Sequence, residues 1–270
     1  MYSAYYGTIV HAPTLSWVEI HPNTILAVDK NGTIVHVEHE HRSNNPRDYI
    51  ANKLEASIDQ IEYYDFLRNP LQFLCPGFID THIHASQYPN VGTGLGVPLL
   101  DWLHEYTFPM EQSFTEENKT STAHEVYNKV ILRTLKNRTT CASYFATIDL
   151  ATTEIFTDLL LEKGQRAYVG KVCMDHNEKF PSYCESLEES IETQGKIIEY
   201  IEKTYDRKNI SNASQKIVTP IVTPRFGPSC SKELLQSLGE ISHQEKLPIQ
   251  THISENLKEV ELMKELYPSY

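Results

Sequence analysis

Most of the chain alternates short apolar runs with amphipathic stretches of helical length, beginning directly after Pro76-Gly77. The apolar runs lie at 78–84, 139–146, 166–174, 221–226 and 248–255. Between and after them, apolar residues recur every three or four positions, as they do on one face of a helix. Strands that alternate with helices form a parallel sheet with right-handed crossovers. The pattern therefore predicts an α/β fold with about five βα units, in a doubly wound sheet or in part of an eightfold barrel.

Local signals for helix ends support the same alternation. Ser186-Leu187-Glu188-Glu189 is a capping box, which predicts the start of a helix. Gly164 follows an amphipathic stretch and predicts a helix end, because glycine readily adopts the left-handed conformation found there. The spacing of apolar residues predicts further helices around 126–135, 234–241 and 260–266.

The N-terminal region has a different pattern, rich in β-branched and aromatic residues. Two such runs flank Asn31-Gly32, which is a strong signal for a β-hairpin. The charged stretch 38–47 predicts a loop. We therefore expect two domains, a small β-rich domain at 1–72 and an α/β domain at 73–270.

Composition and charge exclude several classes of function. The net charge of −12 argues against a surface that binds nucleic acid or anionic lipid, and no apolar run is long enough to span a bilayer. The five cysteines are widely spaced and form no C-x-x-C motif, which argues against a disulfide framework and against a cysteine-rich zinc site. The residues after Met1 do not resemble a signal peptide, so we expect a reducing, cytosolic compartment.

The strongest chemical signal is the pair His82 and His84, at the end of the first predicted strand. Residues two apart on a strand share a face, so both imidazoles should point the same way, at the end where barrel enzymes place their active sites. Two neutral imidazoles at this spacing can hold one divalent metal. A second pair, His39 and His41, follows no apolar strand, and we interpret it as part of a solvated loop.

His252 and Glu255 extend this signal to the fifth predicted strand. His252 would share a rim with His82 and His84 if the strands belong to one barrel. A carboxylate at Glu255 would then stand beside a metal-activated water, where it can transfer a proton. The alternative for Glu255 is an acid in the first turn of a helix, favoured by the helix dipole, and both roles can hold.

Arg225, Phe226 and Gln87 follow two other predicted strands. Arg225 can donate hydrogen bonds to a carbonyl oxygen or an anionic group, and Phe226 can stack on a flat ring. An ion pair and a core aromatic explain these two residues equally well. The amide of Gln87 both donates and accepts, which suits the edge of a nucleobase.

Competing catalytic motifs are incomplete. His104-Glu105 and His124-Glu125 each begin an H-E-x-x-H motif without its second histidine, and no P-C-x-x-C motif of cytidine-deaminase type is present. The glycines at 92–96 lack the spacing of a dinucleotide-binding loop, so we interpret this stretch as a loop over the site.

Beyond single residues, the order of the motifs resembles one family. Residues 76–84 resemble the first-strand signature of the amidohydrolase superfamily, and the motifs after them resemble the guanine deaminases within it. These motifs are H-A-S-Q-Y at 84–88, L-D-W-L at 100–103, Y-T-F-P at 106–109, G-Q-R at 164–166, V-G-K-V-C-M-D at 169–175, I-V-T-P-R-F at 221–226 and H-I-S-E-N at 252–256. The resemblance extends from about residue 70 to the last residue and is weak before that.

The resemblance implies a cytosolic zinc enzyme that hydrolyses guanine to xanthine and ammonia. It implies one Zn²⁺ per subunit held by His82, His84 and His252, with Glu255 as the catalytic residue that carries a proton to the ring. It implies substrate contacts from His84, Ala85, Ser86, Gln87, Arg225, Phe226, His252, Ile253, Ser254 and Glu255. It also implies a homodimer that binds neither nucleic acid nor membrane.

The resemblance also implies a fold, an incomplete TIM barrel of the amidohydrolase type preceded by a small β-sandwich-like domain. The family barrel has eight strands, and its metal site also uses a histidine after the sixth strand and an aspartate after the eighth. About five βα units are present here, so residues 1–72 should be the N-terminal part of a composite β-sandwich and 73–270 the first five units. We expect a fragment of a longer protein or an incomplete gene model, because a genuinely short form would leave two sheet edges unpaired.

Two other functions stay open. A related amidohydrolase could act on another purine, a pterin or a triazine, although Gln87 and Arg225 favour a guanine-like edge. A non-catalytic amidohydrolase-like protein would explain the missing units, but such a protein need not retain the three histidines together with Glu255.

Overall fold

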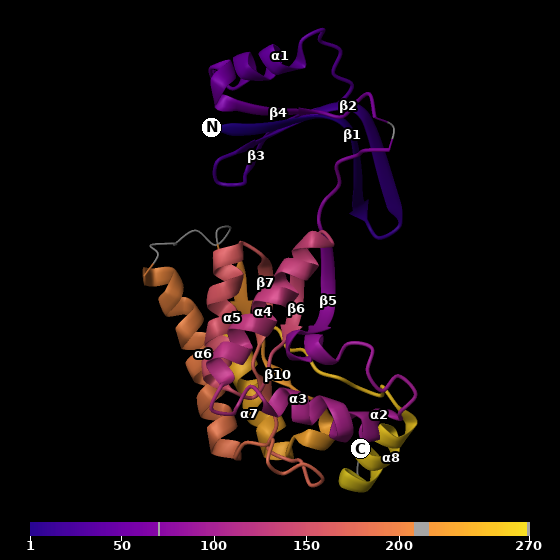
Figure 1. Cartoon of the computed structure of the whole chain (residues 1–270), viewed down its shortest axis with the longest axis vertical. Helices are drawn as coiled ribbons and strands as arrows, with labels where there is room; N and C mark the ends of the chain where they lie inside the picture. The colour runs from indigo at the N-terminus through magenta and orange to yellow at the C-terminus, as the bar shows by residue number, and fades with distance from the viewer. Residues whose placement is uncertain (70, 208–215, 269–270) are drawn as a thin grey trace. The chain divides into compact units, whose positions relative to one another are not determined.

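The structure is a computed structural model that describes residues 1–69, 71–207 and 216–268. It separates into two compact units, Met1–Gly77 and Phe78–Tyr270 (Figure 1). No helix in the described ranges combines the length and the apolar character that crossing a bilayer requires.

The first unit is built on a four-stranded sheet with the strand order β3-β2-β1-β4. Its elements are β1 (Tyr2–Thr14), β2 (Trp17–Asp29), β3 (Ile34–Glu38), α1 (Pro46–Lys53), the short 3₁₀ helix η1 (Ile58–Gln60) and β4 (Ile61–Asp65). β2 pairs antiparallel with β1 and β3, whereas β4 pairs parallel with β1. Apolar side chains of the sheet pack against α1 in one small core. The predicted β-rich region is confirmed, and the second layer of a sandwich stays a prediction.

The predicted hairpin at Asn31-Gly32 is confirmed, and it joins β2 to β3. Gly32 has a φ of +80°, which is the backbone conformation that favours glycine in such turns. The sequence patterns did not predict β4. This strand pairs with β1 over its whole length, and the rings of Tyr5 and Tyr64 stack across the pair at a centroid distance of 5.2 Å.

The prediction of a solvated loop for His39 and His41 is wrong for His41, which is only 4% exposed. Its Nδ1 forms a 2.9 Å hydrogen bond with the Glu38 carboxylate, and its ring packs against Tyr6 and Tyr49. Only one polar edge of this ring keeps a partner, because Nε2 is buried without a hydrogen bond among the described residues.

The second unit contains a parallel sheet with the order β5-β6-β7-β9 and a two-stranded parallel sheet of β8 and β10. Its strands are β5 (Phe78–His84), β6 (Thr139–Phe145), β7 (Arg166–Gly170), β8 (Val172–Cys173), β9 (Val218–Pro220) and β10 (Thr223–Pro224). Its helices are η2 (Ala85–Asn90), α2 (Leu99–Trp102), η3 (Leu103–Thr107), α3 (Phe108–Gln112), α4 (Lys119–Lys136), α5 (Leu150–Lys163), α6 (Leu187–Arg207), η5 (Gly227–Ser229), α7 (Lys232–Glu245) and α8 (Leu257–Leu266). The predicted alternation of strand and helix is confirmed.

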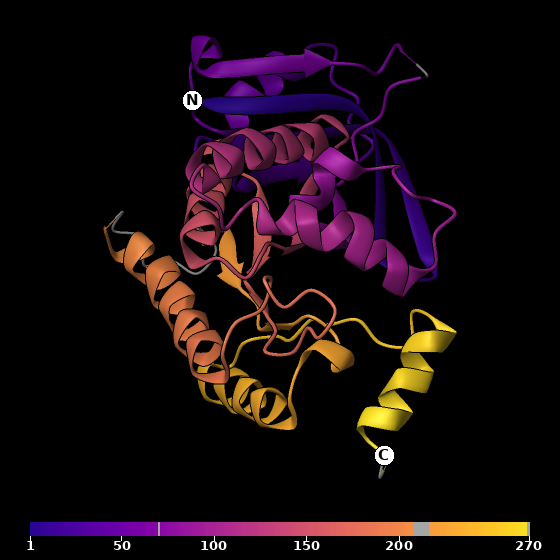
Figure 2. The same ribbon diagram turned by 60° about the horizontal axis from the view of Figure 1, so that its bottom comes forward.

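Helices α4, α5 and α6 lie along one face of the parallel sheet, whereas α8 lies on the side of this unit away from α6 (Figures 1 and 2). Alternate residues of β6 and β7 point into the core beneath these helices, namely Ala142, Tyr144, Ala167 and Val169. The residues between them, such as Ser143 and Tyr168, lie on the opposite face because side chains alternate along a strand. In a closed barrel that opposite face would form the interior.

Both predicted helix ends in this unit are confirmed. Gly164 adopts the left-handed conformation, with a φ of +72°, directly after α5. The Ser186 hydroxyl accepts a 3.1 Å hydrogen bond from the backbone N–H of Glu189 at the start of α6. These ends are set by local hydrogen bonds, which explains why a short stretch of sequence predicts them.

The fourth predicted strand, 221–226, is corrected: only Thr223–Pro224 of it forms a strand, β10, which pairs with β8. The strand β9 ends at Pro220, before the predicted range, and pairs with β7. Pro220 and Pro224 have no N–H to donate, so a continuous ladder cannot form through both. The fifth predicted strand, 248–255, contains only two isolated parallel bridges, from Ile249 to Val222 and from His252 to Phe226.

The third predicted strand, 166–174, is broken between β7 and β8 at Lys171. This lysine is fully buried, and its Nζ donates to the Val172 carbonyl at 3.0 Å and to the Glu185 carboxylate at 2.7 Å. A buried ammonium needs such partners. The chain breaks its strand at Lys171, the residue whose side chain reaches them.

Candidate functional site

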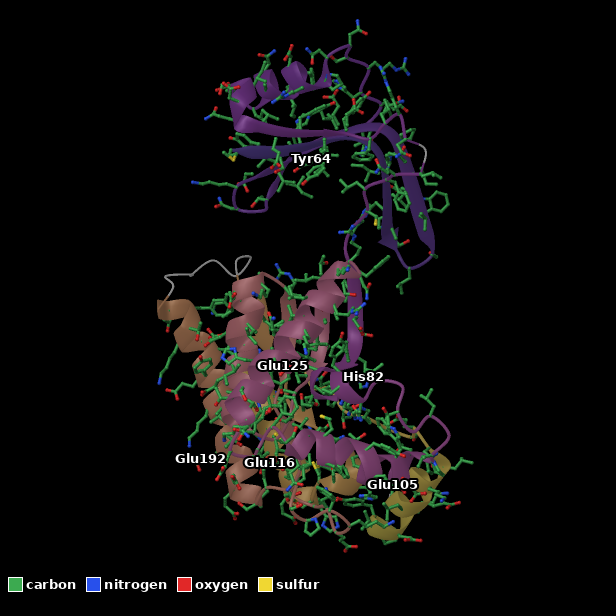
Figure 3. The ribbon with its side chains drawn as sticks, in the orientation of Figure 1. Tyr64, His82, Glu105, Glu116, Glu125 and Glu192 are labelled. Atoms are coloured by element: carbon green, nitrogen blue, oxygen red, sulfur yellow. The ribbon has the colours of Figure 1, made fainter. Side chains whose placement is uncertain are left out.

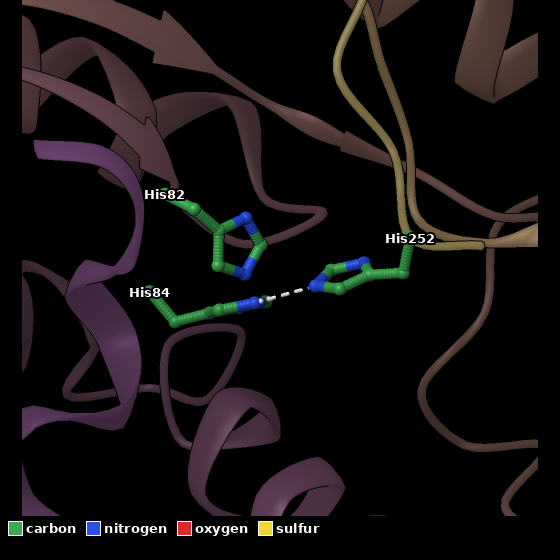
Figure 4. Close-up of side chains that lie close together, drawn as sticks. All are labelled: His82, His84 and His252. Carbon is green, nitrogen blue, oxygen red and sulfur yellow. Dashed lines mark hydrogen bonds between the residues drawn. The ribbon is translucent and has the colours of Figure 1, made fainter. Parts of the chain in front are cut away.

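Three histidine rings from distant parts of the sequence meet at the carboxyl end of β5, where Figure 3 labels His82 (Figures 3 and 4). His82 and His84 come from β5, and His252 comes from the segment that precedes α8. The Nε2 atoms of His84 and His252 are 2.9 Å apart, and one ring nitrogen from each residue lies within 4.8 Å of the others. Among the described residues, this is the one group of three or more His, Cys, Asp or Glu side chains that could hold a metal ion.

Backbone contacts set the direction of the His252 ring. Its Nδ1 lies 2.6 Å from the backbone carbonyl oxygen of Arg225. The backbone N–H of His252 donates a hydrogen bond to the same oxygen at 3.3 Å. A protonated Nδ1 that donates to a carbonyl leaves the Nε2 lone pair free to face His82 and His84. The ring is therefore oriented as a metal ligand requires.

The electrostatic surroundings of two of the three rings favour the neutral form of imidazole. Burial lowers the pKa of His84 well below its usual value, and the nearby Arg225 guanidinium and the other two imidazoles lower it further. Burial likewise lowers the pKa of His252. Only the neutral form of imidazole has a lone pair for a metal, so both shifts favour coordination.

The floor of the site is the ring of Phe145, the last residue of β6, which is fully buried. It stacks on His84 at a centroid distance of 4.6 Å and contacts His82 at 5.0 Å and His252 at 4.6 Å. We did not predict Phe145 as a site residue. Its position at the end of the second predicted strand was the available signal, because parallel strands end at the same rim.

A cavity of about 160 Å³ lies against the histidines. It is lined by His82, His84, Gln87, Leu99, Trp102, Leu103, Arg225, Phe226, His252 and Glu255. A wider hollow of about 670 Å³ shares several of these residues and is bordered by the glycine-containing segment 90–97. The predicted loop at 92–96 therefore lies beside the candidate site.

A buried carboxylate, Glu111 on α3, links the two polar side chains that were predicted to recognise a ring. Arg225 Nη1 donates to Glu111 Oε2 at 2.5 Å, and Gln87 Nε2 donates to Glu111 Oε1 at 3.0 Å. Gln87 Nε2 also lies 3.1 Å from His84 Nδ1, and the Arg225 guanidinium lies 4.9 Å from the centroid of the Phe108 ring. Arg225 therefore forms an ion pair and also lines the cavity. A structural ion pair and a contact with a ligand are both compatible with this position.

Glu111 was not predicted, although it follows the quoted motif at 106–109 by only two residues. It lies on α3, which directly follows a π-helical turn, η3. Single-turn π segments are frequent at functional sites, but nothing in the sequence pattern reveals them.

Glu255 lies at the edge of both hollows, exposed to solvent, just before α8. Its backbone N–H donates to the Glu259 carboxylate at 2.8 Å. Glu255 lies near enough to His252 for its charge to oppose the lowering of that residue's pKa.

Four of the residues implied as substrate contacts do not line the cavity: Ala85, Ser86, Ile253 and Ser254. Ala85 and Ser86 are fully buried in η2, and the Ser86 hydroxyl donates to the Ala146 carbonyl at 3.3 Å. Ile253 is 82% exposed, and the backbone N–H of Ser254 donates to a carboxylate of α8 at 3.0 Å. Substrate contacts from these four residues stay predictions.

Comparison with known proteins relates this geometry to one family. The model of the amidohydrolase family matches residues 73–269. The chain is 43% identical over 265 residues to a probable guanine deaminase of Schizosaccharomyces pombe, and the match covers 97% of this chain and 46% of that protein. It is also 43% identical over 266 residues to the guanine deaminase of Homo sapiens, covering 98% and 54% respectively.

Solved structures give the same relationship. The crystal structure of a guanine deaminase from C. acetobutylicum, with bound guanine in its active site, matches with a TM-score of 0.80 and 32% identity over 100% of this chain and 57% of that one. A zinc-bound adenosine deaminase from Xanthomonas campestris shares the fold, with a TM-score of 0.72. The predicted fold, part of an amidohydrolase barrel after a β-rich domain, is confirmed. The chain spans about half the length of the curated relatives that it matches.

Proposed function

This chain belongs to the amidohydrolase family, and from that premise we propose that it forms part of a zinc-dependent enzyme that hydrolyses guanine to xanthine and ammonia. The observation that carries the proposal is a single cavity bordered by three histidines, Glu255, Gln87 and Arg225. A relative crystallised with guanine in its active site matches the whole of this chain, which supports guanine as the substrate.

The donor set fits Zn²⁺. Ligand nitrogens about 2.0–2.1 Å from a tetrahedral zinc ion lie roughly 3.4 Å from one another. The ring nitrogens of His82, His84 and His252 lie within 4.8 Å of one another, so small side-chain rotations would bring them to that spacing. A zinc ion held there would activate water as a nucleophile at neutral pH. Divalent metals other than zinc would use the same nitrogens.

The residues around the metal position have distinct tasks in this proposal. Phe226 would stack on the flat ring, while Gln87 and Arg225 would hydrogen-bond to its polar edge and hold it in one orientation. The Glu255 carboxylate would take a proton from the attacking water and deliver it to the ring nitrogen next to the amino-bearing carbon. The second proton of the water would then pass to the amino group, so that a carbon–oxygen bond replaces the carbon–nitrogen bond and ammonia leaves.

The proposal is tested by ammonia release from the full-length protein that contains this chain, loaded with zinc. We expect release from guanine and much slower release from adenine, a pterin and an aminotriazine. Faster release from one of those three compounds would favour the related-amidohydrolase alternative. Absence of release from all four, with zinc bound, would favour a non-catalytic protein.

Several properties accompany this proposal. We propose that residues 1–72 contribute to a composite β-sandwich, that 73–270 supply the first five barrel units, and that a longer protein supplies the rest. We also propose a homodimer in the cytosol, with a role in purine catabolism or salvage. Sedimentation of the full-length protein and cell fractionation test the last two properties directly.

A further inference from the structure

We propose that Glu111 is a positioning residue that neutralises the charge of Arg225, and that this neutralisation makes the site select a neutral purine over an anionic one. The inference rests on the proposed function, because it concerns which charge state of a purine the same cavity accepts. Glu111 does not line the cavity, so it would act through Arg225 and Gln87 and would not contact the substrate.

The geometry of the carboxylate supports this role. Glu111 is fully buried, and its two oxygens bond to two different residues, Arg225 at 2.5 Å and Gln87 at 3.0 Å. Both partners line the cavity beside the histidines. One carboxylate therefore sets the orientation of two side chains that would recognise the ring, which a purely local ion pair would not require.

The charge of Arg225 is what Glu111 changes most. Arg225 is only 2% exposed, and the Phe108 ring lies 4.9 Å from its guanidinium group, so little water screens its charge. Without a carboxylate partner, a guanidinium in such surroundings would attract an anion strongly. With Glu111 bound, the pair is neutral overall, and the remaining N–H groups of Arg225 can donate to a neutral carbonyl oxygen.

Gln87 adds orientation to this charge effect. A glutamine amide can turn over, which exchanges its donor and acceptor ends. The bond from Nε2 to Glu111 fixes which end of the amide faces that carboxylate and leaves the carbonyl end for other partners. Glu111 would thus determine both the charge and the hydrogen-bonding pattern that the cavity offers to a ring.

The test compares binding of two purines to the full-length, zinc-loaded protein. Urate is anionic at neutral pH, whereas hypoxanthine is neutral, and both dissociation constants can be measured by calorimetry. Glu111→Gln keeps the shape of the side chain but leaves Arg225 unneutralised. We expect the ratio of the hypoxanthine constant to the urate constant to rise on the order of tenfold, because urate binds more tightly and hypoxanthine more weakly.

Glu105→Gln is the matched control, since Glu105 is an exposed acid on the preceding turn and carries the same charge change (Figure 3). It should leave the ratio unchanged. The double variant Glu111→Gln/Arg225→Gln should return the ratio toward the wild-type value, because it removes the charge that attracts urate. A general loss of folding would weaken both ligands together and would not move the ratio.

The outcomes separate this inference from the proposed function. If guanine is hydrolysed but Glu111→Gln leaves the ratio unchanged, or the double variant keeps the raised ratio, the inference is wrong and the proposed function stands. If the ratio shifts as expected but guanine is not hydrolysed, the inference stands as a binding property and the proposed reaction is wrong. A wild-type protein that binds urate at least as tightly as hypoxanthine would overturn the inference, whereas the proposed function is decided by ammonia release from guanine.

Discussion

At the scale of single residues, the site depends on what each polar atom faces. His252 Nδ1 is bound to a backbone carbonyl, and its Nε2 lies toward His82 and His84. We therefore predict that His252→Ala weakens zinc binding by more than about 10²-fold, because even loss of a residue that only orients a ligand costs about 10–100-fold. Competition with a chromophoric chelator measures this. His11→Ala, at an exposed position of the first unit, should change nothing, and equal zinc affinity in both variants would argue against the site.

Glu255 should matter for turnover but not for the metal. Glu255→Gln in the full-length protein is expected to lower turnover of guanine by roughly 10²–10⁴-fold while zinc stays bound, because the amide keeps the shape but cannot take a proton. Steady-state rates and metal content measure the two effects. Glu261→Gln, which changes an exposed acid on the following helix α8, should leave the rate unchanged. Near-normal turnover of the Glu255 variant would reduce this residue to an acid at the start of a helix.

At the scale of elements, the segment that carries His252 depends on one close approach. A Cβ atom on Gly170, at the end of β7, would lie 2.0 Å from Thr223 Oγ1 and 2.4 Å from Gln250 Nε2. Gln250 in turn donates to the backbone carbonyl of Tyr144 and to Thr223 Oγ1, both at 3.0 Å. The side chain of Gln250 thus ties segment 248–252 to β6 and β10 where a regular strand ladder is missing.

We predict that Gly170→Ala lowers the free energy of unfolding by about 1–3 kcal/mol, because an added methyl group in a filled interior forces neighbours to move. Zinc affinity should fall with it, since the movement displaces His252. Denaturant unfolding and chelator competition measure these quantities. Gly195→Ala is the matched control, because Gly195 lies on α6 with nothing within 4 Å of an added Cβ, and alanine there should stabilise the helix by up to about 1 kcal/mol.

The buried pair of Lys171 and Glu185 joins β7 to the segment before α6, and it should respond to pH. Burial raises the pKa of Glu185, although Lys171 opposes the shift. Lys171→Met removes that opposition and leaves a buried carboxylate unpaired, which should cost about 3–5 kcal/mol at pH 8. A raised pKa means that the folded state binds the proton more tightly than the unfolded state, so stability lost at high pH is regained as pH falls.

The loss caused by Lys171→Met should therefore be smaller at pH 5 than at pH 8, as measured by denaturant unfolding at both values. Lys129→Met is the control, because Lys129 forms an exposed pair with Glu125 on α4, and its loss should change the free energy of unfolding little at either pH. An equal loss at both pH values for Lys171→Met would show that Glu185 stays charged without its partner.

At the scale of the whole molecule, the parallel sheet of the second unit leaves apolar surface open. Ile79 is 69% exposed, Ile249 51% and Tyr168 40%, and these residues border a hollow of about 280 Å³ on the face opposite α4 and α5. β5 and β9 are the edges of the sheet, with no further strand paired to them in the described ranges. In a closed barrel the same residues would be interior.

We predict that residues 1–270 by themselves associate, because open strand edges and exposed apolar surface favour it. We also expect this segment to hydrolyse guanine orders of magnitude more slowly than the full-length protein, since losing members of a catalytic unit costs that much. Sedimentation velocity and ammonia release with and without zinc test both statements. A monomer that unfolds cooperatively and shows zinc-dependent turnover would contradict them.

The sequence by itself determined the features that depend on near neighbours. Helical periodicity, the capping box at Ser186 and the stop at Gly164 each involve a few consecutive residues, and the structure has them where they were predicted. The spacing of His82 and His84 is equally local, because the geometry of a strand places such a pair on one face. The motifs that indicated the family are also local, because each consists of a few consecutive residues.

Only the tertiary structure decided the features that depend on residues far apart in the chain. The partner of Arg225 is Glu111, 114 positions earlier, and no periodicity links the two. His41 is buried because Tyr6 and Tyr49 enclose it, and segment 248–252 is held by a side chain where the pattern predicted a strand. Burial and ion pairing depend on which elements pack together. Local sequence patterns do not specify the distances between residues that are far apart in the chain.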